Sequence, residues 1–113
     1  NMSLLFMNLG QQVNVINTDG NLNNEINGIF ACDLLSHVMG HSKEGNLLIT
    51  VLNNINVLGV TSLLDLCCVI FTHDTEVNEA ILKKANELEI PLFVTKLSTA
   101  EITIKLYEFG ITP

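Results

Sequence analysis

Short, fully apolar segments recur about every 20 residues in the second part of the chain, and this recurrence constrains the fold most. They are Leu47 to Val51, a segment that begins at Leu66 or Cys68 and ends at Phe71, and Leu92 to Thr95. Strands this apolar are typical of a parallel sheet, because crossover helices cover both of its faces. We therefore expect an α/β fold with right-handed crossovers, a three-layer α/β/α sandwich around a mostly parallel sheet of about five strands.

Capping residues mark where the helices begin and end. Ser98 and Glu101 have the spacing of a capping box, which predicts a last helix that stops at Gly110. Two early strands, Gln12 to Ile16 and Ile26 to Ala31, flank a turn-rich segment from Asn17 to Asn24. Four further helices are predicted. The first spans Met2 to Leu9 and stops at Gly10, and the second is capped by Asp33 and runs through Met39 to a stop at Gly40. The third has Asn53 as its N-cap, and the fourth, capped by His73, Asp74 and Thr75, spans Glu76 to about Leu88.

The charged residues exclude several classes of function. The chain has five lysines, no arginine and twelve acidic residues, which gives a net charge of −7. Nucleic-acid binding requires a basic patch, so we expect no nucleic-acid partner. No segment approaches the ~18 consecutive apolar residues of a membrane span. The first residues also lack the basic region of a signal peptide, so we expect a cytoplasmic protein with no membrane contact.

The balance of apolar and charged residues predicts a protein partner. Hydrophobic residues make up 48% of the chain and charged residues only 15%, below the roughly 25% charged that is typical of soluble domains. So little charge leaves apolar surface to be covered, and a homodimer is the simplest way to cover it. The three cysteines, Cys32 and the adjacent pair Cys67 and Cys68, have no disulfide spacing and are expected to be reduced, the pair as buried apolar residues.

Four segments occur in a specific order and spacing: ACDLLSHVM (31–39), EGNLLIT (44–50), NINVLGVTSLLDL (54–66) and IPLFVTKLSTAEITIKLYEFGI (90–111). Together they resemble the DRTGG domain family over nearly the whole chain, which is therefore expected to be one domain, residues 1–113. The closing half is also similar to the N-terminal domain of HPr kinase/phosphorylase, without its ATP-binding half. The family's Thr-Gly-Gly corresponds to Ile26, Asn27 and Gly28, so this chain keeps only the last glycine.

The resemblance implies a non-catalytic regulatory or dimerisation module with no cofactor. Such domains occur alone, beside nucleotide-sensing CBS domains, and in the non-catalytic parts of phosphotransacetylases and pyrophosphatases. Our leading hypothesis is a homodimeric regulatory domain that senses a small anionic ligand such as a nucleotide and controls a metabolic enzyme. The alternative is a ligand-free protein–protein adaptor beside a metabolic or redox enzyme, and a metal- or thiol-dependent enzyme is the least favoured reading.

Ligands of open parallel sheets bind beyond the carboxyl ends of the strands, near a switch in strand order. The N-termini of the helices near Asn53, Thr75 and Ser98 can offer N–H groups to an anion there. The competing interpretation is that these polar residues are ordinary caps and turns. The candidate ligand-binding residues at this edge are Asn27, Gly28, Asp33, Ser36, Thr50, Asn53, Asn54, Asn56, Thr72, His73, Thr95, Ser98 and Thr99.

Two histidines raise a metal-binding alternative. His37 and His41 are four residues apart, a spacing that metal ligands use, and Cys32 or Asp33 is a candidate third ligand. We expect Gly40 to end the helix between the histidines, and no glutamate follows His37 as the zinc-peptidase motif requires. We therefore predict no metal site and two solvent-facing histidines near a dimer interface. A Cys32–His37 nucleophile–base pair remains open, but nothing in the sequence activates that thiol.

Overall fold

The structure is a computed structural model that describes residues 2–17 and 22–113, without the side chains of Ser3 and Leu4. Part of the predicted turn between Asn17 and Asn24 therefore lies outside the described residues. A five-stranded sheet has the order β1-β5-β4-β3-β2, in which β2 to β5 are parallel and β1 pairs antiparallel with β5. The strands are β1 (Asn14–Val15), β2 (Ile29–Ala31), β3 (Leu47–Thr50), β4 (Cys68–Phe71) and β5 (Leu92–Val94).

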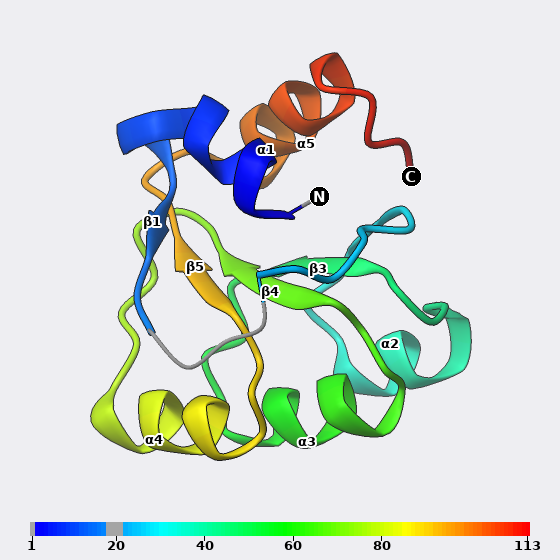
Figure 1. Cartoon of the computed structure of the whole chain (residues 1–113). Coiled ribbons are helices and arrows are strands. Elements are labelled where there is room, and N and C mark those ends of the chain that lie inside the picture. Colours follow the sequence, from blue (N-terminus) through cyan, green and yellow to red (C-terminus); the bar gives the residue numbers. More distant parts are fainter. Residues whose placement is uncertain (1, 18–21) are drawn as a thin grey trace.

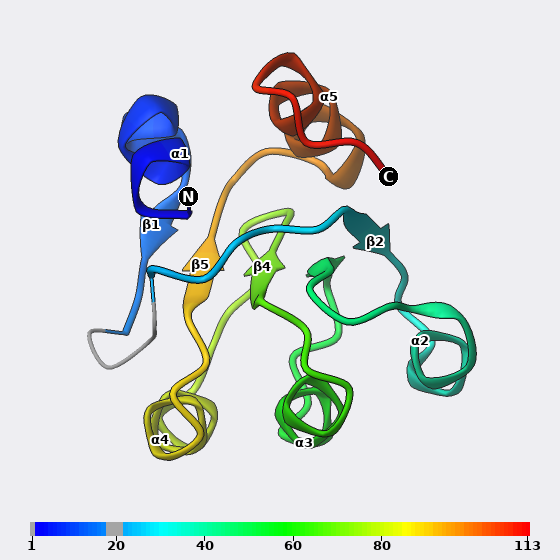
Figure 2. The same cartoon turned by 45° about the vertical axis from the view of Figure 1, so that its right-hand side comes forward.

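Helices cover both faces of this sheet (Figure 1). Figure 2 shows α2, α3 and α4 below the sheet and α1 and α5 above it. The helices are α1 (Met2–Leu9), followed by a 3-10 turn (Gly10–Gln12), then α2 (Leu35–His41), α3 (Asn56–Leu63), α4 (Glu79–Glu87) and α5 (Thr99–Glu108). The predicted three-layer α/β/α architecture with a mostly parallel, five-stranded sheet is confirmed.

Alternation along the strands builds a separate core on each face. Leu47 and Ile49 pack with α1 and α5 residues, while Leu48 packs among residues of the α2, α3 and α4 side. Every residue of β3 and β4 is buried, which explains why their sequences are almost entirely apolar and do not alternate with polar residues. Above the sheet, the Phe6 ring of α1 stacks on Phe93 of β5 with a centroid separation of 3.7 Å.

The predicted boundaries of α2 are wrong at both ends. Asp33 is not the N-cap, because its Oδ1 accepts hydrogen bonds from the Thr50 hydroxyl and the Val51 N–H, both at 2.8 Å. Its carboxylate therefore joins α2 to the end of β3. Gly40 does not stop the helix, which continues to His41 and ends where the Ser42 hydroxyl bonds the Val38 carbonyl. Packing of the buried Val38 stabilises the helix despite the glycine.

The starts of α3 and α4 also lie later than predicted. Asn53 does not cap α3, since its side-chain amide donates to the Glu76 carbonyl at 2.8 Å. The N-cap of α4 is Asn78, whose Oδ1 accepts from the Ile81 N–H at 2.9 Å. His73 and Asp74 have φ values of 57° and 56°, which are left-handed and incompatible with a helix start.

A buried amide joins the N-terminal part of the chain to β5. Asn17 is buried, and its side chain donates to the Ile90 carbonyl at 2.7 Å and accepts from the Leu92 N–H at 2.8 Å. It thereby supplies both hydrogen bonds that a neighbouring strand would give to this edge of β5. Both backbone groups would be buried without partners if the amide were removed.

We expect Asn17→Ala to destabilise the fold by about 2 kcal/mol or more, because a buried group left without its hydrogen bond costs about 1–3 kcal/mol. Urea unfolding measures this change. Asn8→Ala, at an exposed position of α1, is the matched control and should stay within about 0.5 kcal/mol of the wild type. Equal stability of the two variants would contradict the bridging role of Asn17.

The predicted capping box of α5 is present and gives a pH-dependent test. The Ser98 hydroxyl accepts from the Glu101 N–H, and the Glu101 carboxylate accepts from the Ser98 N–H, which lowers the pKa of Glu101. Because the pKa of Glu101 is lower in the folded state than in the unfolded state, the carboxylate stabilises the fold at pH values above the ordinary pKa of glutamate. This stabilisation is lost as the pH falls through the lowered pKa. Ser98→Ala should cost about 1 kcal/mol at neutral pH.

Glu101→Gln should be less stable than the wild type at neutral pH, and the difference should vanish in acid. Thermal unfolding between neutral pH and pH ~3 measures this, since the ordinary pKa of glutamate is about 4.3. Glu108→Gln, at the far end of the same helix, is the control for a general charge effect. A Glu101→Gln difference that persists unchanged in acid would show that the carboxylate does not act through this cap.

Candidate functional site

Buried threonines close the carboxyl ends of the three inner strands. Thr50, Thr72 and Thr95 are each no more than 3% exposed. The hydroxyl of Thr50 accepts from the Leu52 N–H at 3.0 Å, and the hydroxyl of Thr95 accepts from the Leu97 N–H at 3.1 Å. These bonds form tight local turns in which the side chains satisfy the backbone that leaves the sheet.

The sheet has a topological crevice between β4 and β5, because the chain leaves β4 towards α4 and leaves β5 towards α5 on the opposite face (Figure 2). Such a crevice is where ligands of open parallel sheets bind. Here the chain bridges it: the His73 N–H donates to the Leu97 carbonyl and the Asp74 N–H to the Thr95 carbonyl, both at 2.9 Å. The Thr99 N–H at the start of α5 donates to the His73 imidazole at 3.3 Å.

The remaining predicted residues of this edge are engaged in the same way. The Thr72 and Thr99 hydroxyls bond each other at 2.9 Å, and the side-chain Oδ1 of Asn54 accepts from the Asn56 N–H at 2.9 Å. Ser36 is exposed on α2, while Asp33, Asn53 and Ser98 make the bonds given above. Most of these polar side chains are thus bonded within the protein, in caps, turns and longer-range contacts.

Asn27 and Gly28 do not lie at that edge, so their predicted placement is wrong. Both precede β2, which puts them at the amino edge of the parallel strands. Asn46, buried at the start of β3, donates to the Asn27 carbonyl at 2.7 Å and accepts from the Lys43 N–H at 2.8 Å. Gly28 has φ +95°, and a Cβ there would lie 3.0 Å from the Asn46 amide nitrogen, so the turn requires glycine.

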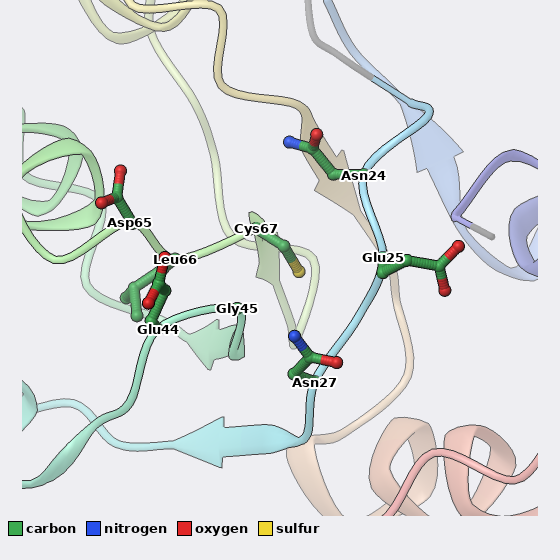
Figure 3. A pocket seen from close by; sticks show the side chains of 8 residues that line it. All are labelled: Asn24, Glu25, Asn27, Glu44, Gly45, Asp65, Leu66 and Cys67. Carbon is green, nitrogen blue, oxygen red and sulfur yellow. The ribbon is translucent and has the colours of Figure 1, made fainter.

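Cavities lie along this amino edge, and the first is acidic. It has a volume of about 460 Å³ and is lined by Asn24, Glu25, Asn27, Glu44, Gly45, Asp65, Leu66 and Cys67. Figure 3 shows the Glu25 carboxylate directed away from Asp65 and Glu44. With three carboxylates and no basic side chain among its lining residues, this cavity opposes the binding of an anion.

A second cavity at the same edge, the Lys43 cavity, has a different character. It measures about 390 Å³ and is lined by Asn27, Gly28, Ile29, Phe30, His41, Lys43, Glu44, Asn46 and Pro113. The Ile29 N–H donates to the Thr112 carbonyl at 3.1 Å, which brings the C-terminal residues to its wall. The cavity thus combines an ammonium group, a carboxylate, an imidazole, two amides and the Phe30 ring.

Lys43 and Asn46 were not among the predicted site residues. The available signal was the turn composition of Lys43-Glu44-Gly45-Asn46, because an asparagine side chain in a turn often bonds the backbone nearby. Sequence alone does not show that this turn lies against Gly28, since the contact depends on the pairing of β2 with β3.

The structure places the histidines and cysteines in distinct surroundings. His37 and His41 lie on α2 with ring centroids 4.0 Å apart, whereas the Cys32 sulfur lies 3.5 Å from the Leu34 backbone nitrogen. Cys67 and Cys68 are buried as predicted, and burial raises the pKa of the Cys68 thiol well above its usual range. In the described part of the chain, no group of three or more His, Cys, Asp or Glu residues can hold a metal ion.

None of the helices in the described residues is long and apolar enough to span a membrane.

The fold resembles that of a solved regulatory region. The structure is that of the CBS and DRTGG domains of the regulatory region of Clostridium perfringens pyrophosphatase, complexed with the activator diadenosine tetraphosphate. The TM-score is 0.74 at 11% sequence identity, over 94% of this chain but only 45% of that chain. The present chain therefore spans less than half of that regulatory region, and the likeness concerns the fold.

Comparison with curated proteins gives no match. The model of the DRTGG domain family matches residues 10–109, which include all strands of the sheet and the turn at Gly28. The resemblance expected from the four sequence segments is thereby confirmed. The chain belongs to the DRTGG domain family.

Proposed function

We propose that this domain is a regulatory module that binds a small anionic ligand, a nucleotide in the first instance, in the Lys43 cavity. Its family membership and the activator-bound pyrophosphatase region with the same fold support a regulatory role. The observation that carries the choice of site is the position of Lys43 in a 390 Å³ cavity next to Gly28. Gly28 is the residue at which this chain keeps the family's signature.

Charge favours this cavity over its neighbour. The chain carries a net charge of −7, so its overall field opposes the approach of a phosphate. The acidic cavity adds Glu25, Glu44 and Asp65 to that repulsion. The Lys43 cavity shares Glu44 with its neighbour but has no other carboxylate side chain among its lining residues. Its lysine offers a compact positive charge to a phosphate, and the Phe30 ring suits a base.

We further propose that the 113-residue chain acts as one domain, forms a homodimer and controls a metabolic enzyme. Large apolar side chains that face solvent on several helices support a protein partner. The most exposed are Met7 (74%), Leu63 (72%), Leu34 (62%), Tyr107 (62%), Ile104 (61%) and Met39 (52%). The same side chains favour the second candidate function, a protein–protein adaptor that binds no small ligand.

Nucleotides should raise the melting temperature of the protein in a concentration-dependent manner, because a ligand that binds only the folded state stabilises it by about 2.7 kcal/mol at 100 times its Kd. Thermal shifts with mono-, di- and triphosphate nucleotides and with diadenosine tetraphosphate measure this. Lys43→Ala should abolish the shift, whereas Lys83→Ala, an exposed lysine of α4, should keep it. If no nucleotide raises the melting temperature, the adaptor function is favoured instead.

The homodimer has its own test. Sedimentation equilibrium at micromolar concentration should give twice the chain mass of 12.4 kDa. A mass of one chain under these conditions would contradict the dimer without affecting the proposed ligand site.

A further inference from the structure

We infer that His37 and His41 form a binding site for a divalent transition-metal ion such as Zn²⁺, Ni²⁺ or Cu²⁺. The inference rests on α2, which continues through Gly40 and ends at His41. Residues four apart on a helix lie on the same face, and both side chains are exposed here. The sequence argued against a metal site because Gly40 was expected to separate the two histidines, and the structure removes that objection.

The two rings lie side by side, within reach of one ion. Their centroids lie 4.0 Å apart with the planes tilted by 31°. Zinc–nitrogen bonds of about 2.0–2.1 Å in a tetrahedral site put two coordinating nitrogens ~3.3 Å apart. Within the described residues, no hydrogen bond or ion pair engages either ring, although the Phe30 ring lies beside His37 with a centroid separation of 6.4 Å. Rotation of the two side chains therefore breaks no such bond when it directs one nitrogen of each towards a shared ion.

The end of the helix favours a cation at this position. The last carbonyl groups of a helix carry a partial negative charge, which stabilises positive charge near the final turn. His41 is the last residue of α2. The final turn of α2 is held in place by the buried Val38 side chain and by the Ser42 hydroxyl, which donates to the Val38 carbonyl at 2.6 Å. The final turn that carries His41 is therefore held before any ion binds.

The site has two protein ligands and open positions for water or an external donor. Cys32 is unsuited as a third ligand, since its sulfur contacts the Leu34 backbone at 3.5 Å. Asp33 is engaged by Thr50 and Val51. Imidazole ligands suit zinc, copper and nickel, with Cu²⁺ bound most tightly, and do not suit Mg²⁺ or Ca²⁺, which prefer oxygen ligands.

This metal site does not depend on the ligand proposed for the Lys43 cavity. His41 lines that cavity, but His37 does not. His37→Ala therefore tests the metal site alone, and nucleotide binding in metal-free buffer tests the cavity alone.

Isothermal titration of the full chain with Zn²⁺, after removal of metals with EDTA, should show a single ion per chain and no comparable binding of Mg²⁺. Loss of an outer-shell partner already costs about 10- to 100-fold in metal affinity. We therefore expect His37→Ala and His41→Ala each to raise the Kd for Zn²⁺ by about 100-fold. Met39→Ala, on the same helix and 52% exposed, is the matched control and should bind as the wild type does.

A second measurement uses the unaltered protein. In NMR spectra, Zn²⁺ should shift the imidazole resonances of His37 and His41 and leave those of His73 in place, because the His73 ring accepts the Thr99 N–H. Binding of Zn²⁺ by His37→Ala with wild-type affinity, binding of Zn²⁺ no tighter than Mg²⁺, or a shift at His73 alone would each overturn the inference.

Discussion

Burial of β3 and β4 on both faces is the constraint on which the rest of the structure depends. Their residues lie between two helical layers, so their backbone groups need hydrogen-bond partners within the protein. The neighbouring strands supply these partners. Side chains serve the turns beside β3: the Thr50 hydroxyl accepts from the Leu52 N–H after the strand, and the Asn46 amide donates to the Asn27 carbonyl before it.

The two edges of the sheet differ in how the chain crosses them. At the carboxyl edge, the crevice between β4 and β5 is bridged by the bonds of His73 and Asp74, and the start of α5 is occupied by an imidazole. At the amino edge, the turns around Gly28 and Gly45 leave cavities of several hundred Å³. The acidic cavity and the Lys43 cavity differ in charge, because only the Lys43 cavity has a lysine among its lining residues.

Much of the fold could be predicted because it follows from local and periodic patterns. The apolar segments predicted the parallel strands, and the Ser98–Glu101 spacing predicted the capping box that the structure contains. Helix starts were predicted less well. Asp33 and Asn53 are good capping residues by type, but each bonds a segment far along the chain, Asp33 at Thr50 and Asn53 at Glu76. A local signal cannot distinguish a cap from such a long-range partner.

The sequence by itself determined the layer architecture and the family, because both depend on the order and period of apolar segments that any chain with this pattern must bury. Only the tertiary structure decided which side chains line the two proposed sites. Lys43 meets Gly28 because β2 pairs with β3, and His37 meets His41 because the packing of Val38 carries α2 past Gly40. Such contacts depend on strand pairing and on helix length. Both are determined by the free energy of the whole fold and cannot be read from one short segment.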